Sequence, residues 1–97
     1  MGETQPARVK PDLAGTPSLW RHAEEKVAAL TSRELEVLTL MAEGLSGPAI
    51  GVALGISHRT VDIFRGKLLR KLEVKSGTLA VRFAVYAALA QRCHGHN

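Results

Sequence analysis

Cysteine, aromatic side chains and long apolar runs are all scarce in this chain of 97 residues. Cys93 is the single cysteine, so no disulfide can form within the chain, and a reducing cytoplasm is the expected compartment. Aromatic residues make up only 4%, so the core must be built from Leu, Val, Ile and Ala, which suits packed helices. The longest apolar stretch, residues 79–90, is too short to span a bilayer, and we expect neither a signal peptide nor a membrane partner.

The chain also lacks the residue sets that carry catalysis or hold metals. No Ser/His/Asp or Cys/His set is placed on adjoining helix faces. The run Cys93-His94-Gly95-His96 contains metal-ligand types, but there is no second cluster with which it could pair. We therefore predict no enzyme, no metal site and no cofactor.

What the chain does have is a basic excess, and it is unevenly placed. The formal net charge is +4, whereas residues 1–30 carry equal numbers of acidic and basic side chains. Residues 57–75 carry six basic and two acidic side chains, which accounts for the whole excess. Such a charge run can be an ordinary solvated surface, but on a helix it also suits a nucleic-acid partner.

That basic segment lies within residues 46–75, whose spacing predicts a helix-turn-helix. We expect one helix over about 46–54, a turn at Gly55-Ile56-Ser57 and a second helix over about 58–72. Gly51 is small where the two helices must cross, and Gly55 can adopt the positive φ of the turn. In this motif the second helix enters the major groove of DNA. One domain is all that this length supports.

The second helix separates an inner and an outer face, because each residue rotates by about 100° around the axis. Val61, Phe64, Leu68 and Leu72 should point inward, and Arg59, Ile63, Gly66 and Arg70 outward. An exposed Ile63 among charges is unusual for a solvated surface, but it suits contact with thymine methyl groups. The predicted DNA-binding residues are Ser46, Gly47, Ser57, His58, Arg59, Thr60, Asp62, Ile63, Gly66, Lys67 and Arg70.

The remaining segments complete an all-α domain. Residues 1–18 are rich in Pro and Gly and should be a disordered tail or a linker. Residues 19–97 should form the domain, with its core in residues 30–90, and residues 19–30 can form a short helix. Thr31-Ser32-Arg33-Glu34 is a capping box that should start a helix ending at Gly44.

The last predicted helix, about 76–91, is apolar nearly all round, with Arg82 as the only charge between Leu79 and Ala90. One face can pack on the core, and the other then needs a partner, most simply a second copy of the chain. Arg82 is expected at the rim of this interface. The predicted dimer-interface residues are Leu79, Val81, Arg82, Val85, Tyr86 and Leu89.

Several spaced blocks resemble the LuxR-type helix-turn-helix family, and most closely its FixJ/NarL response-regulator branch. The blocks are residues 30–38, Gly44-Leu45-Ser46, Ile50, Leu54, Ile56-Ser57, Thr60-Val61, Lys71-Leu72, Val74-Lys75-Ser76 and Leu79-Ala80-Val81-Arg82. The resemblance covers residues 30–90. It implies a four-helix domain, sequence-specific binding to double-stranded DNA, a homodimer formed through the last helix, and transcription control in bacteria, with RNA polymerase as a candidate further partner.

The sequence departs from the family pattern at three places. Gly47-Pro48-Ala49 stands where the family often has Asn-Lys-Glu, Phe64 replaces the usual His, and Gly77 replaces a common Arg. The chain also has no receiver domain, so it is either the effector domain of a larger regulator or a standalone one. The lost Lys and the presence of Asp62 leave a second function open, a protein-interaction domain that kept the fold and lost the DNA.

Overall fold

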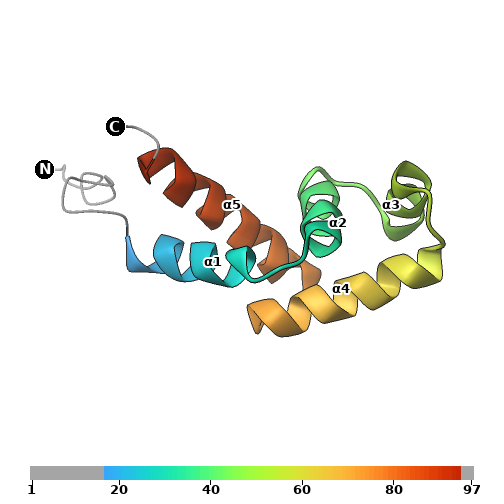
Figure 1. Ribbon diagram of the computed structural model, residues 1–97, viewed down its shortest axis with the longest axis horizontal. Helices are drawn as coiled ribbons and strands as arrows, with labels where there is room; N and C mark the ends of the chain where they lie inside the picture. Colours follow the sequence, from blue (N-terminus) through green and yellow to red (C-terminus); the bar gives the residue numbers. More distant parts are fainter. Residues whose placement is uncertain (1–16, 95–97) are drawn as a thin grey trace, which may run out of the picture.

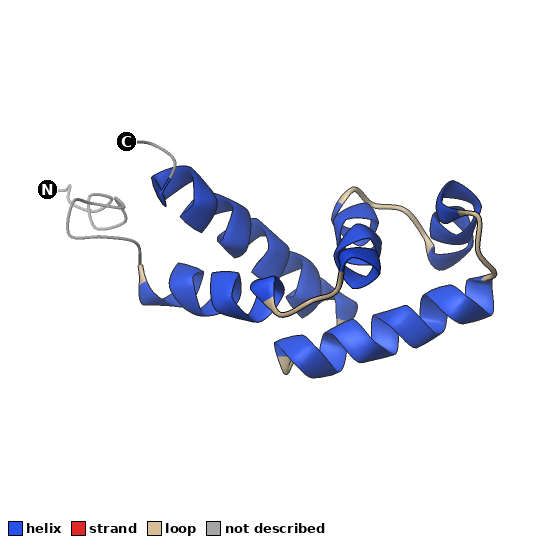
Figure 2. Cartoon of the chain, viewed as in Figure 1, coloured by secondary structure: helices blue, strands red, loops and turns tan. Residues whose placement is uncertain are grey.

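The computed structural model describes residues 17–94, which form five α-helices joined by short loops (Figures 1 and 2). They are α1 (Ser18–Ala28), α2 (Ser32–Ala42), α3 (Gly47–Leu54), α4 (His58–Leu72) and α5 (Gly77–His94). The all-α prediction is confirmed, with α1 added to the four helices of the predicted domain. The predicted tail falls almost wholly on residues 1–16, which lie outside the described residues.

Helices α2 to α5 surround a small aliphatic core. Its fully buried members are Val37, Leu38, Ile50, Val61, Leu68, Leu72 and Ala80. Phe64 and Phe83 are only partly buried against this cluster. The scarcity of aromatic residues is thus met by Leu, Val and Ile side chains of α2, α3 and α4 together with Ala80 of α5, as the composition predicted.

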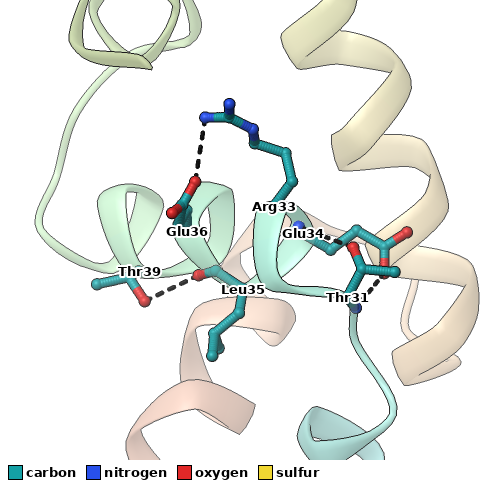
Figure 3. Close-up of polar contacts among 6 residues, drawn as sticks. All are labelled: Thr31, Arg33, Glu34, Leu35, Glu36 and Thr39. Atoms are coloured by element: carbon teal, nitrogen blue, oxygen red, sulfur yellow. Dashed lines mark hydrogen bonds and ion pairs between the residues drawn. The ribbon is translucent and has the colours of Figure 1, made fainter.

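The N-terminus of α2 has the predicted capping box (Figure 3). The Glu34 amide donates to Thr31 Oγ1 at 3.2 Å, and the Thr31 amide donates to Glu34 Oε1 at 2.9 Å. Two amides that the helix itself cannot satisfy are therefore paired. Figure 3 also shows Arg33 paired with Glu36 and the Thr39 hydroxyl donating to the Leu35 carbonyl.

Glu34 has a second role that the capping pattern did not predict. Lys71 Nζ, on the last turn of α4, lies 2.8 Å from Glu34 Oε1, and the carboxylate side chain is only 4% exposed. Burial raises the pKa of Glu34. The hydrogen bonds from Lys71 and from the Thr31 backbone outweigh that effect and hold the pKa below its ordinary value of 4.5. This pair fastens α2 to α4.

Helix α1 packs along α5, and the two extend together from the α2–α4 region (Figure 1). Ala23 is fully buried there, as is Ala90 of α5. The His22 and Phe83 rings meet edge to face with centroids 5.8 Å apart, and Gln91 Nε2 donates to a Glu24 carboxylate oxygen. The short helix predicted for residues 19–30 is confirmed, but its position along α5 was not predicted.

Candidate nucleic-acid interface

The turn between α3 and α4 brings the two helices of the motif into close contact. Gly55 adopts the left-handed conformation with φ 72°, as predicted. A Cβ on Gly51 would lie 2.7 Å from the Ile56 carbonyl oxygen, so only glycine allows the turn to fold this tightly onto α3. The Ser57 hydroxyl then accepts from the Thr60 amide at 3.0 Å and starts α4.

Helix α4 buries one face and exposes the opposite one, as the helical period predicted. Val61, Leu68 and Leu72 have no exposed surface, whereas the Ile63 side chain is 53% exposed. Arg59, Lys67 and Arg70 are also exposed. Three cations therefore share with one apolar side chain the side of α4 that faces away from the core, which we call the outer face.

The other predicted DNA-binding residues lie around this outer face or at the N-termini of α3 and α4. Asp62 and His58 are exposed on one flank, with His58 Nε2 3.5 Å from Asp62 Oδ1. Gly66 is open, because the only atom near a Cβ placed there would be Arg70 Nη1 at 4.0 Å. Ser46 caps α3 by accepting from the Ala49 amide, with half-buried Gly47 next to it.

Some side chains in the site already have partners within the chain. Ser57 and Thr60 exchange a hydroxyl contact of 2.9 Å, and Thr60 is half-buried. Their hydroxyl groups therefore stabilise the start of α4. A hydroxyl group that also contacts DNA would have to keep this capping hydrogen bond at the same time.

Not all of the basic excess is on the outer face. Lys71 is paired with Glu34, as described above. Arg65 lies near the start of α5, where its Nη2 would be 3.2 Å from a Cβ on Gly77 and its Nε is buried. Both belong to the basic run of residues 57–75 that indicated a nucleic-acid partner, although neither was among the predicted DNA-binding residues. Sequence position alone does not show where a long side chain ends.

The predicted dimer residues of α5 divide into two groups. Leu79, Arg82 and Val85 are exposed, and Val81, Tyr86 and Leu89 are half-buried. Helix α1 packs against α5, where Ala87 and Ala90 are buried. Part of the apolar surface that appeared to need a second chain is thus covered by the chain itself, and a narrower exposed stripe remains.

The family model described as bacterial regulatory proteins, luxR family, matches residues 28–84, more than half of the chain. The chain belongs to the luxR family. This confirms the resemblance seen in the sequence and agrees with the turn geometry of α3 and α4. Membership in a family of regulatory proteins also confirms the prediction that the chain is not an enzyme.

Curated relatives of this luxR-family domain are named as regulators. The transcriptional regulatory protein FixJ of Azorhizobium caulinodans is 36% identical over 68% of this chain and 31% of its own length. The uncharacterized transcriptional regulatory protein YhcZ of Bacillus subtilis is 48% identical over 64% of this chain and 29% of its own length. The nitrate/nitrite response regulator NarP of Escherichia coli is 46% identical over 59% and 26% respectively. The chain thus spans about a third or less of these relatives.

Among residues 17–94, no helix is both long and apolar enough to cross a membrane. Gly95 and His96, the last two residues of the cysteine–histidine run, lie outside the described residues.

Proposed function

We propose that this luxR-family domain is a sequence-specific DNA-binding regulator of transcription, acting in the bacterial cytoplasm as a homodimer. In this function α4 lies in the major groove. RNA polymerase is a further partner that such a regulator would contact. The names of the relatives support regulation of transcription, and the geometry of α4 supports DNA as the ligand.

The outer face of α4 is the observation that carries this proposal. Arg59, Lys67 and Arg70 are exposed cations that can pair with phosphates or with the acceptor atoms of guanine. Ile63 would otherwise be exposed to water at a cost in free energy, but thymine methyl groups offer it an apolar contact. A purely solvated surface explains the cations but not the isoleucine among them.

The homodimer is proposed from the exposed stripe on α5. Leu79 and Val85 are 36% and 49% exposed, and no acidic residue lies between positions 77 and 93 to keep copies apart. A single α4 contacts only a few base pairs. Two copies on a two-fold operator would bind more tightly than one, because the second copy binds as part of the same complex. Half-sites about one helical turn apart are the expected spacing.

A salt titration tests the proposal directly. For a DNA-binding domain, the logarithm of the association constant falls linearly with the logarithm of the salt concentration, because each phosphate contact releases counterions. We expect a steep slope on random duplex and tighter binding on a selected operator. Arg21→Ala, which removes an exposed cation from α1, is the control and should leave the slope nearly unchanged.

A protein-interaction domain is the second candidate function. Two observations favour it. Pro48 is exposed in the first turn of α3, where the family often has a Lys that could pair with a phosphate, and Asp62 places a carboxylate beside the outer face. Binding to duplex DNA that is weak and insensitive to salt would favour this second function over the first.

A further inference from the structure

The flank of α4 carries a charge opposite in sign to the rest of the outer face. Asp62 is the one acidic residue among the 15 residues of α4, and its side chain is 58% exposed. A carboxylate on a DNA-facing helix is repelled by phosphates and lowers affinity for every sequence. Its presence therefore calls for a ligand group that a carboxylate can bind.

This carboxylate lies beside the residue one helical turn earlier. His58 Nε2 lies 3.5 Å from Asp62 Oδ1. The His58 ring in turn lies against the first turn of α3, because a Cβ on Gly47 would be only 2.8 Å from His58 Nε2. Gly47 and Asp62 thus hold the imidazole between them, and the carboxylate has a contact on one side.

One helical turn after Asp62, the surface of α4 carries only a glycine. Gly66 follows it by four residues on the same face of the helix, and nothing lies within 4 Å of a Cβ placed there except Arg70 Nη1. A base edge could therefore approach the backbone of α4 next to Asp62. The carboxylate is on the N-terminal half of α4, the part of a recognition helix that contacts bases.

Base chemistry limits what an ionised carboxylate can bind in the major groove. A carboxylate only accepts hydrogen bonds. Guanine presents two acceptors, N7 and O6, and adenine presents its amino donor beside the N7 acceptor. Cytosine presents its N4 amino donor without an acceptor on the same base edge, and acidic side chains are its usual partners.

We propose that Asp62 determines specificity by accepting a hydrogen bond from the N4 amino group of a cytosine in each half-site and by rejecting guanine there. His58 is a positioning residue that acts through its contact with the Asp62 carboxylate. This inference rests on the proposed DNA-binding function, and it adds the base that one named side chain selects.

Selection from a randomised duplex pool tests the inference on the whole chain. We expect the parent to enrich cytosine over guanine about tenfold at one position of each half-site. Asp62→Ala should lose that preference at that position alone and bind random duplex more tightly. Asp62→Asn should move the preference toward adenine, because the amide oxygen can accept from the N6 amino group while the amide NH2 donates to N7.

His58 is tested by two further variants. His58→Ala and Gly47→Ala, whose new methyl group displaces the ring, should both weaken the cytosine preference without abolishing it. A role of His58 in folding alone would leave base preference unchanged. Glu25→Gln removes an exposed carboxylate from α1 and is the control, which should keep the parent consensus.

The inference is overturned if Asp62→Ala keeps the parent preference at every position and only binds all duplexes more tightly. It is also overturned if the parent consensus contains no cytosine that depends on Asp62. Either result leaves the proposed function in place, because the parent still binds DNA. If the parent retains no duplex even at low salt, the proposed function falls together with the inference.

Discussion

At the scale of single residues, the outer face of α4 combines groups that make different contacts. Arg59 lies near the helix N-terminus and Arg70 near its C-terminus, with Ile63 between them. Residues near the start of a recognition helix contact base edges, whereas those further along more often contact phosphates. Arg59 is therefore the cation with the greatest expected influence on sequence preference.

Arg59→Ala should weaken binding to a selected operator by roughly 1–3 kcal/mol and relax the preference at one base position. Titration of labelled duplex at physiological salt measures the loss, with Arg21→Ala as the control for the removed charge. Unchanged affinity, with helical content as in the parent, would exclude Arg59 from the interface.

Two glycines of the motif make a matched pair for stability. A Cβ at Gly51 meets a backbone oxygen at 2.7 Å, whereas one at Gly66 meets nothing closer than 4.0 Å. Gly51→Ala should lower the free energy of unfolding by roughly 1–3 kcal/mol, because the turn backbone must shift. Gly66→Ala should raise it by about 0.5–1 kcal/mol, the usual gain in a helix interior.

Urea denaturation of the two variants measures this difference. If Gly51→Ala were as stable as Gly66→Ala, the close contact between α3 and the turn would be absent in solution. The two substitutions add the same methyl group, so the difference in stability reports on the surroundings of each glycine.

At the scale of elements, two ion pairs join the C-terminal end of α4 to α2 and to α1. Glu34 joins α2 to Lys71 of α4, and Glu73, the left-handed residue after α4, pairs with Lys26 of α1 at 3.0 Å. The hydrogen bond from Lys26 lowers the pKa of Glu73. The Glu73 carboxylate is exposed and the Glu34 carboxylate is buried, so the Glu34 pair should contribute more to stability.

Glu34 should therefore make stability depend on pH. Its pKa is lower in the folded chain than its ordinary value of 4.5, so its contribution is fully present above about that pH and is lost as the pH falls through the folded value. Glu34→Gln can keep the capping box but loses the ionic bond to Lys71, at a cost of about 1–2 kcal/mol near neutral pH.

Thermal unfolding between pH 7 and pH 3 measures this dependence. The difference in unfolding midpoint between parent and Glu34→Gln should shrink below about pH 4.5. Glu25→Gln, which removes an exposed carboxylate, is the control. A difference that stays constant across this range would show that the Lys71 pair does not stabilise the fold through its charge.

At the scale of the whole molecule, α5 has one side covered by the core and α1 and another side exposed. Arg82 and Val85 belong to the exposed side, and Leu89 beside them is half-buried. Because Val85 is 49% exposed, a charge there can remain in water when the chain is a monomer. Substitution at this position therefore separates dimer formation from folding.

Val85→Asp should leave helical content nearly unchanged, lower the sedimentation mass at high protein concentration and abolish cooperative binding to paired half-sites. Val52→Asp, at an α3 valine that is 84% exposed, is the control for adding a charge and should keep the mass of the parent. If Val85→Asp matches the parent in mass and in cooperativity, the dimer forms elsewhere.

The helix starts and the turn of the motif could be predicted because they depend on residues close together in the chain. The capping bonds of Thr31 and Ser57 join residues three apart. The turn needs one residue with a positive φ, and Gly55 adopts it without strain. The inner and outer faces of α4 follow from helix periodicity alone. These features needed no knowledge of how the helices pack.

Tertiary structure decided the contacts between residues far apart in sequence. Lys71 and Glu34 are separated by 37 positions, and their pairing requires the particular crossing of α2 and α4. The sequence of α5 did not determine whether its apolar surface packs on the core, on α1 or on a second chain, because the hydrophobic effect has no direction of its own. Where α1 packs on α5, and where the Arg65 side chain ends, depend on the shape that the assembled helices leave free.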